Sequence, residues 1–331
     1  MSKLYPFLLL VLFSLIGCRS EKSSGNNSRF ANEITLDGDS VMIDTISGVV
    51  GSVRAYNDNY ILFLYDSDNF LMIADPTFTP VAYSAPKGQG PSEVQWVTSE
   101  YGYPCGRDSF HVFDPYSKRL YRADLSGSPL DEVFTPGESL IAASPRALLP
   151  MSDGHFAGLY GTSRYGMFDY DPETDSITVW PVGVEELEAK KDERTNYSVT
   201  SLRSMAYEPT RKLVGEIYGK IPVAVIHNED GSVYGVIRSG DIPDIGLIKE
   251  EDKEEYHHIR MTPNYIYLLH GDTDCSIMAY DYDLKPVAKM SIRPASHFDV
   301  DAGRRRFIAV DPNSDSTNIM VYPIPEFIPV P

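Results

Sequence analysis

Residues 60–75 read YILFLYDSDNFLMIAD, in which two mainly apolar runs flank the polar turn DSDN. Short runs rich in aromatic and β-branched residues, bounded by turn-forming residues, predict β-strands joined in a hairpin. A third run, PVAY at residues 80–83, follows after a second turn. This stretch therefore predicts three consecutive antiparallel strands.

The same unit recurs along the chain. Its six copies cover residues 60–83, 109–127, 155–180, 212–237, 265–290 and 306–322. Their second strands end roughly 40 to 57 residues apart, a spacing typical of one four-stranded propeller blade. The innermost strand of each blade is expected just upstream of its copy, at residues 93–98, 145–149, 204–208, 259–262 and 297–301.

The sixth copy lacks an outer strand, because Pro323, Pro325, Pro329 and Pro331 cannot donate hydrogen bonds to a ladder. The apolar segment 42–48 is expected to fill that place and join the two ends of the chain. The sequence thus predicts an all-β, six-bladed β-propeller over residues 41–325, closed by an N-terminal strand and followed by a Pro-rich tail at 326–331. A pair of β-sandwiches, which also has many short strands, is the competing architecture.

The first residues have the features of an export signal. Lys3 precedes the apolar run 7–16, which is too short to span a bilayer but fits the core of a secretory signal peptide. The run ends in Leu15-Ile16-Gly17-Cys18, which resembles the lipobox of bacterial lipoproteins. The resemblance implies a signal peptide at 1–17, acylation of Cys18 and a flexible tether over 18–40. The alternatives are an ordinary signal peptide with a chance cysteine and a short membrane anchor.

The formal net charge of −18 sets limits on the partners. An acidic surface repels phosphate backbones, so we expect no nucleic-acid binding, and attachment to the membrane through the lipid only. Cys105 and Cys275 are assigned to blades two and five, across the ring from each other, so no disulfide is expected. We also expect a monomer.

A turn motif, Lys87-Gly88-Gln89-Gly90-Pro91-Ser92-Glu93, stands between the first two copies. It resembles the Gly-x-Gly-Pro-Gly-Glu signature of TolB-like six-bladed propeller lipoproteins of Bacteroides-type bacteria, and departs from it at Ser92. The segment 207–213 resembles that family's mid-chain turn. The resemblance implies the fold and anchoring in the cell envelope. Arg19 follows Cys18 in place of the Asp of a common inner-membrane retention signal, so the outer membrane is the expected site. Most members of the family have no established function.

The motif also has a physical interpretation of its own. Gly88 and Gly90 are expected to adopt backbone angles closed to other residues, Pro91 fixes the exit of the turn, and Glu93 can accept hydrogen bonds from turn amides. A structural role on a connector between blades is favoured over ligand binding.

Motifs that would identify an enzyme are absent from the sequence. It contains no Gly-x-Ser-x-Gly elbow, no His-Glu-x-x-His, no Cys-x-x-Cys and no phosphate loop. His257 and His258 adjoin an acidic run at 250–255, which favours a solvated loop or short helix over a metal site. No catalytic residue and no metal ligand is predicted; a calcium ion in the channel is left open as a cofactor.

Two function classes remain. The first, favoured because spacing nominates no nucleophile with a base, is a non-catalytic binding module of the cell envelope that recognises an envelope protein or a glycan. The second is a lactonase-like hydrolase or lyase with a metal or polar cluster at the channel mouth. Fold alone does not decide between them. The candidate binding face comprises Gln89, Glu93, Arg146, Arg164, Arg203 and His270.

Overall fold

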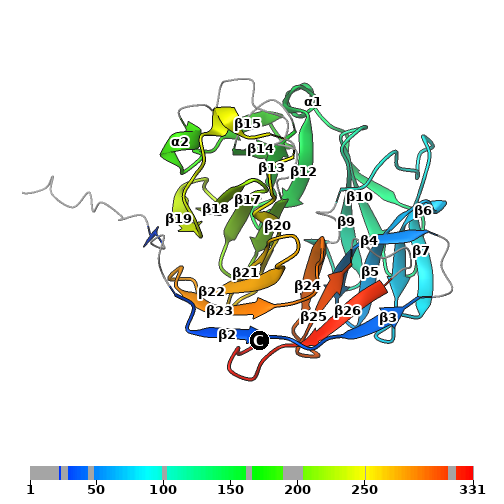
Figure 1. The fold of residues 1–331 in the computed structure, drawn as a ribbon. Helices are drawn as coiled ribbons and strands as arrows, with labels where there is room; N and C mark the ends of the chain where they lie inside the picture. Colours follow the sequence, from blue (N-terminus) through cyan, green and yellow to red (C-terminus); the bar gives the residue numbers. More distant parts are fainter. Residues whose placement is uncertain are drawn as a thin grey trace, which may run out of the picture.

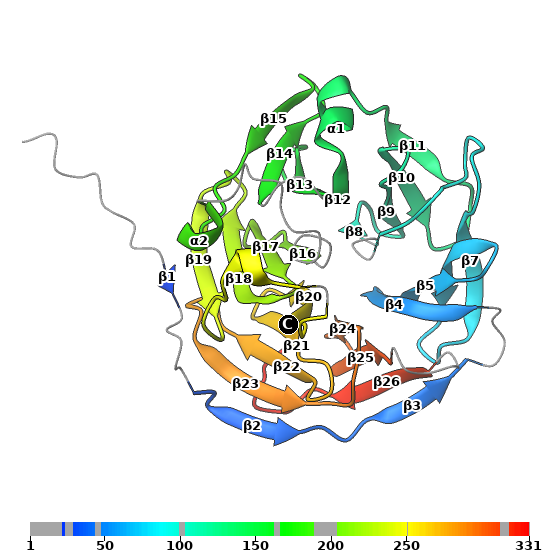
Figure 2. The same cartoon turned by 45° about the horizontal axis from the view of Figure 1, so that its top comes forward.

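The computed structural model describes residues 22–23, 29–43, 48–98, 103–161, 166–188, 204–249, 251–311 and 318–330. These residues form six mainly antiparallel sheets arranged radially around one axis (Figure 1, Figure 2). This arrangement confirms the six-bladed propeller and excludes a pair of sandwiches. Among the described residues, no helix combines the length and the apolar composition needed to cross a bilayer.

Each blade runs from an inner strand at the axis to an outer strand at the rim. Blade 1 contains β4 (Val49–Tyr56), β5 (Asn59–Tyr65), β6 (Asn69–Ala74) and β7 (Pro80–Pro86). Blade 2 contains β8 (Tyr103–Pro104), β9 (Ser109–Asp114), β10 (Arg119–Asp124) and β11 (Asp131–Phe134). Blade 3 contains β12 (Pro145–Pro150), β13 (Phe156–Tyr160), β14 (Met167–Asp171) and β15 (Ser176–Val179).

The second half of the ring repeats this order and adds strands from the N-terminus. Blade 4 contains β16 (Ser204–Glu208), β17 (Leu213–Tyr218), β18 (Ile221–Asn228) and β19 (Val233–Arg238), with β1 (Lys22–Ser23) at its rim. Blade 5 contains β20 (Tyr256–Met261), β21 (Ile266–His270), β22 (Ser276–Tyr280) and β23 (Pro286–Ser291), with β2 (Asn32–Thr35) at its rim. Blade 6 contains β24 (His297–Asp301), β25 (Arg306–Val310), β26 (Asn318–Pro323) and β3 (Asp39–Met42). The helices α1 (Glu138–Ala143) and α2 (Glu185–Glu188) and the 3₁₀ turn η1 (Ile245–Leu247) lie on connectors.

The apolar strand residues pack between neighbouring blades. Ile61 and Phe63 of β5, for example, share one buried cluster with Val112 of β9 and Tyr121 of β10. Each such side chain contributes roughly 1.5–3 kcal/mol by leaving water. The core is therefore a ring of inter-blade contacts, which explains why the strands read as nearly continuous apolar runs.

The N-terminal segment closes the ring, although not where the sequence analysis placed it. The closing strand is β3, residues 39–42, which pairs antiparallel with β26, and β2 runs parallel to β23 as an added edge strand of blade 5. The predicted closing segment, 42–48, was therefore placed too far toward the C-terminus, because Val49 already begins the inner strand of blade 1. The predicted tether, 18–40, overlaps β1, β2 and the start of β3, so the ordered ring begins before residue 41.

One predicted inner strand was wrong. Residues 93–98 form a connector, and the inner strand of blade 2 is the two-residue β8. Val94 instead forms an isolated parallel bridge with Lys87, which draws this segment into the turn motif. The other four inner strands match or overlap the predicted segments. Cys105 lies next to blade 2 and Cys275 in blade 5, and both thiols are free.

The Pro-rich tail packs on the ring. Ile328 is fully buried in the cluster between blades 5 and 6. Arg305 Nη2 donates to the carbonyl oxygens of Pro325 at 3.1 Å and Ile328 at 3.2 Å. The residues after β26 thus follow the sheet without extending its ladder, as their proline content requires.

A buried polar network joins the last blade to the first. The Tyr60 hydroxyl of β5 donates to Asp301 Oδ2 of β24 at 2.5 Å and accepts from Arg306 of β25. Arg306 Nε also lies 3.1 Å from Asp301 Oδ2. Burial would raise the pKa of Asp301, but hydrogen bonds from Tyr60, the Arg304 amide and Arg306 outweigh it and lower the pKa. The network ties the two blades together at the point where the ring closes.

Candidate binding site

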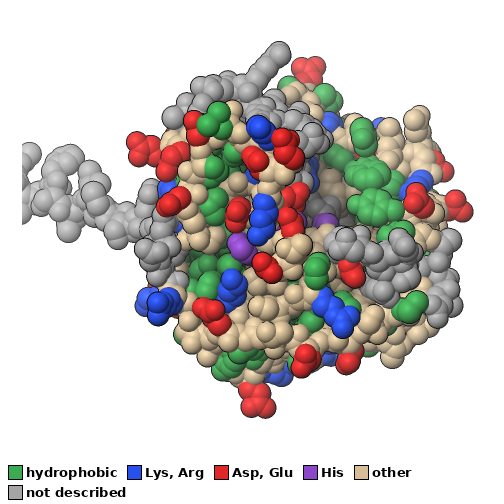
Figure 3. Space-filling view, in the orientation of Figure 1, with side chains coloured by type: hydrophobic (Ala, Val, Ile, Leu, Met, Phe, Trp, Pro, Cys, Tyr) green, Lys and Arg blue, Asp and Glu red, His purple; other side chains and the backbone are tan. Residues whose placement is uncertain are grey.

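A cavity of about 670 Å³ opens at one end of the axis, among blades 1, 2, 3 and 6. We call it the mouth cavity. Its lining comes from connectors between blades (Trp96–Thr98, Ser144–Arg146, His297), from turns in blades 2 and 3, and from the ends of β4 and β5. Figure 3 shows hydrophobic side chains gathered beside a hollow in this face. This is the connector face on which the sequence analysis placed its candidate binding residues.

Exposed aromatic rings form one wall of the mouth cavity. Trp96, Tyr65 and Tyr116 have 37%, 41% and 69% of their surface exposed. Trp96 is held by ring contacts with Phe63 at 5.9 Å and Phe70 at 5.5 Å, and it lies 6.2 Å from Tyr65. Clustered exposed aromatic rings are unusual on a soluble surface and mark sites that bind apolar faces.

The buried carboxylate of Asp114 accepts hydrogen bonds from the two backbone segments that carry Trp96 and Tyr116. Its Oδ2 accepts from the Gln95 amide at 3.0 Å, and its Oδ1 accepts from the Tyr116 amide at 2.9 Å. One carboxylate at the end of β9 therefore fixes the residue before Trp96 as well as Tyr116. The connector that carries Trp96 and the turn that carries Tyr116 are therefore both fixed by hydrogen bonds to Asp114.

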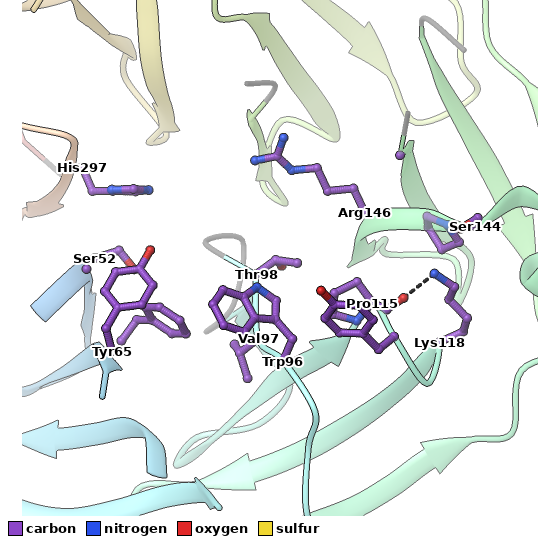
Figure 4. A pocket seen from close by; sticks show the side chains of 15 residues that line it. Ser52, Tyr65, Trp96, Val97, Thr98, Pro115, Lys118, Ser144, Arg146 and His297 are labelled. Atoms are coloured by element: carbon purple, nitrogen blue, oxygen red, sulfur yellow. Dashed lines mark hydrogen bonds between the residues drawn. The ribbon is translucent and has the colours of Figure 1, made fainter. Parts of the chain in front are cut away.

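Across the mouth cavity lies Arg146, whose position follows from local sequence. Ser144 ends α1 in the left-handed conformation, with φ of 48°, and Pro145 cannot continue the helix. In the pairing of β12 with β13 the register shifts between Pro145 and Ala147, so Arg146 is the extra residue of a β-bulge. Bulges re-aim side chains, and Figure 4 shows Arg146 extending over Trp96 and Thr98 toward His297.

Arg146 has no polar partner, and no acidic group lines its cavity, within the part of the chain that the structure describes. Among the described residues its guanidinium has no hydrogen bond and no ion pair. The fifteen lining residues include Lys118, Arg146 and His297 but neither Asp nor Glu. On a chain with a net charge of −18, this makes the mouth cavity a local positive region.

His297 contributes a neutral polar group. Burial, together with the neighbouring charges of Arg260, His257 and Arg146, lowers the pKa of His297 to about 3. Its Nδ1 lies 3.1 Å from Ser296 Oγ, and its ring packs edge-on against His258 with centroids 4.9 Å apart. At neutral pH the imidazole can therefore donate or accept a hydrogen bond without adding charge.

Below the mouth cavity, paired charges line the axis around a smaller cavity of about 170 Å³. Arg260 Nε lies 2.9 Å from Asp299 Oδ1, and Asp299 Oδ2 accepts from the Ala55 amide at 2.7 Å. Arg54 stacks on the Tyr103 ring at 4.5 Å. Both oxygens of Asp299 are thus engaged by the chain itself, which leaves it poorly suited to a channel calcium ion.

A polar cluster lies on the same face in blade 5. His257 Nδ1 is 2.8 Å from Glu254 and its Nε2 is 2.9 Å from Asp272. Burial would lower the pKa of His257, but the two carboxylates outweigh it and raise the pKa. The expectation of a solvated loop or short helix was wrong here, because His257 is the bulge residue of β20. The three groups could approach one metal ion, although a protonated imidazole between two carboxylates satisfies the same geometry.

The turn motif lies outside the described lining of the mouth cavity. Glu93 Oε2 accepts from the Gly90 amide at 2.8 Å, which confirms the expected hydrogen bond. The expected backbone angles were wrong, because neither Gly88 nor Gly90 has a positive φ. Gly88 is favoured here by lack of space instead, because a Cβ at this position would lie 1.9 Å from Glu93 Oε2. Pro91 is exposed in this turn.

The predicted binding face is only partly brought together. Arg146 lines the mouth cavity, whereas Gln89 is exposed on the turn motif and His270 Nε2 lies 3.3 Å from Glu255 in blade 5. Cys18, Arg164 and Arg203 lie outside the described residues. Sequence reasoning missed Trp96, Tyr65, Tyr116 and His297. The available signal was Trp96, one of two tryptophans in the chain, placed directly after the turn motif.

No family model and no curated protein matches this chain. Solved structures do resemble it. A Bacteroides fragilis protein, named only as a predicted exported protein, has a TM-score of 0.55 and 11% identity over 88% of this chain and 98% of its own. A DUF4221 family member from Bacteroides vulgatus has a TM-score of 0.54 and 10% identity over 87% and 96%. A protein of unknown function from Bacteroides thetaiotaomicron has a TM-score of 0.54 and 9% identity over 90% and 75%. Likeness at this identity shows the fold alone.

Proposed function

We propose that this protein is an exported lipoprotein, acylated at Cys18, whose propeller binds a ligand in the mouth cavity without transforming it. The lipobox-like sequence at residues 15–18 and the exported propellers of similar fold support the envelope assignment. The likeness of the turn motif to TolB-like lipoproteins supports anchoring in the envelope, and Arg19 after Cys18, in place of an inner-membrane retention Asp, supports the outer membrane. We expect the protein to act as a monomer and to recognise a glycan or protein of the envelope.

The observation that carries this proposal is the pairing of an exposed aromatic wall with the uncommitted Arg146. Ligand sites typically combine apolar surface with a few convergent polar groups, and the mouth cavity has both. Its described lining offers one imidazole and no carboxylate or thiolate. It therefore lacks the paired carboxylates of glycoside hydrolysis and a ligand set for a catalytic metal.

Anchoring can be tested separately from binding. In cells fed a labelled fatty acid, the wild-type protein should carry the label and fractionate with membranes, whereas Cys18→Ser should lose both properties. A labelled Cys18→Ser protein would contradict the assignment of the acylated residue.

Binding is tested with full-length protein in detergent and a pool of envelope glycan fragments, followed by tryptophan fluorescence. Trp96 reports on the mouth cavity, whereas Trp180 is 3% exposed in blade 3. The wild type should show a saturable change that Tyr116→Ala abolishes while Trp96 remains as the reporter. Leu247→Ala, which removes a 72% exposed side chain outside the lining, is the matched control and should bind normally. Equal binding by Tyr116→Ala and the control would contradict the proposal.

A hydrolase or lyase is the second candidate, and the Glu254, His257 and Asp272 cluster is the observation that favours it. An enzyme that uses this cluster would convert a bound fragment over hours, and the conversion would stop in His257→Gln. Recovery of unchanged fragments from wild-type incubations, monitored by NMR, is the result expected of a binding protein.

A further inference from the structure

We propose that the ligand of the mouth cavity is an acidic saccharide: a pyranose that carries a carboxylate, as uronic and sialic acids do. The inference rests on the proposed binding function and specifies its ligand class.

The aromatic wall matches the apolar face of a sugar ring. Tyr65, Trp96 and Tyr116 present rings that are a third to two thirds exposed, at the rim of an open cavity of about 670 Å³. A pyranose has one face of C–H groups and a periphery of hydroxyls, so it can stack on such rings while its hydroxyls stay wet. A fully apolar ligand would instead need an enclosed pocket.

Arg146 supplies the charge selectivity. Its planar fork matches a carboxylate with two parallel hydrogen bonds, and no described residue already occupies it. Figure 4 places it on the side of the cavity across from Tyr65 and Trp96, so a ring stacked on the wall can direct its carboxylate to the guanidinium. The nearby neutral imidazole of His297 can bond a hydroxyl.

The charge balance favours one carboxylate over more highly charged groups. The described lining residues include no Asp or Glu to repel an anion, but the chain as a whole carries −18. A polyphosphate or nucleic acid would need several cations, whereas this site offers Arg146 and Lys118, and Lys118 Nζ already donates to the Pro115 carbonyl. A ligand with a single carboxylate therefore matches the one available guanidinium.

The test compares an acid with its ester on the intact protein. Full-length protein in detergent is titrated by calorimetry with trigalacturonate, with its methyl ester and with sialyllactose. Charge-assisted hydrogen bonds of about 1.5–3 kcal/mol correspond to roughly 10- to 100-fold in affinity. We expect the acid to bind 10- to 100-fold more tightly than the ester, and its affinity to fall with added salt. Preference for sialyllactose over trigalacturonate would assign the carboxylate to a sialic-type sugar, within the same class.

Two variants and one control locate the effect. Arg146→Gln should bind acid and ester equally, whereas Trp96→Ala should weaken both. Arg107→Gln removes the same charge from an exposed position on the β8–β9 loop, outside the cavity lining, and should behave as wild type. Retained acid selectivity in Arg146→Gln would overturn the inference.

The remaining outcomes separate this inference from the proposed function. Equal binding of acid and ester by the wild type overturns the acidic class but leaves a saccharide-binding protein. Binding of acidic peptides in place of every sugar overturns the saccharide assignment. If the three saccharides, the envelope fragments and acidic peptides all fail to bind, the proposed function itself fails.

Discussion

Replacing Tyr60 by Phe should loosen the joint between the last blade and the first. The change removes one oxygen, which donates to Asp301 and accepts from Arg306. The ring itself stays buried and stacked on Phe78, with centroids 4.5 Å apart. Burial and the bond to Asp301 raise the pKa of Tyr60 to about 12, so the hydroxyl is a neutral donor at every working pH.

The expected loss of stability in Tyr60→Phe depends on the hydrogen bonds that the Asp301 carboxylate retains. A hydrogen bond to a charged group contributes roughly 1.5–3 kcal/mol. Asp301 keeps Arg306 Nε at 3.1 Å and the Arg304 amide at 3.1 Å, which limits the cost of losing the third partner. We therefore expect the free energy of unfolding to fall by about 2 kcal/mol in Tyr60→Phe.

Urea unfolding followed by tryptophan fluorescence measures this change, and Tyr65→Phe is the matched control. Tyr65 lies on the same strand, is 41% exposed, and its hydroxyl has no hydrogen bond among the described residues. Its loss should change stability by less than about 0.5 kcal/mol. Equal effects of the two substitutions would refute the role given to the network. A double-mutant cycle with Asp301→Asn should show coupling of about 1 kcal/mol or more.

Two further predictions concern the turn motif and the polar cluster of blade 5. Gly88→Ala should destabilise the protein by about 1–3 kcal/mol, because its Cβ would displace the Glu93 carboxylate from the hydrogen bond that it accepts from the Gly90 amide, whereas Gly303→Ala, with no atom nearer than 3.7 Å, should be nearly neutral in the same urea assay. His257 has a raised pKa in the folded state, so its stabilisation is fully present below pH ~6.5 and is lost as the pH rises through the folded-state value. The stability difference between wild type and His257→Gln should therefore shrink from pH 5.5 to pH 8.5; a constant difference would contradict the charged pair.

The repeated hairpin could be predicted from sequence because every blade buries two apolar strands, and this burial leaves a strong local pattern. The inner strand of blade 2 could not be predicted. With only Tyr103 and Pro104 in its ladder, β8 has no periodicity to detect, and the apolar residues upstream belong to the connector that carries Trp96. The closing strand was placed too late because β3 is short and mostly exposed, so its sequence resembles a loop.

The candidate site was predictable in its location but not in its membership. Its face follows from the propeller order, and Arg146 could be named because it lies at the start of a predicted inner strand. The orientation of the Arg146 side chain depends on a β-bulge, which no residue type in this segment predicts. The aromatic wall depends on Asp114 bracing two separate segments, a contact between positions that are unrelated in local sequence.

The pairing of β3 with β26 governs how the chain acquires its shape. Met42 lies opposite Asn318, so nearly the whole polypeptide must be made before this ladder can form. Contacts of such long sequence separation slow folding, because the entropy of loop closure is lost before the strand pairing contributes any stabilisation. While the chain folds, its early strands keep an open edge until the last strand arrives, which makes this interval the period when the protein is most exposed to chaperones and to aggregation.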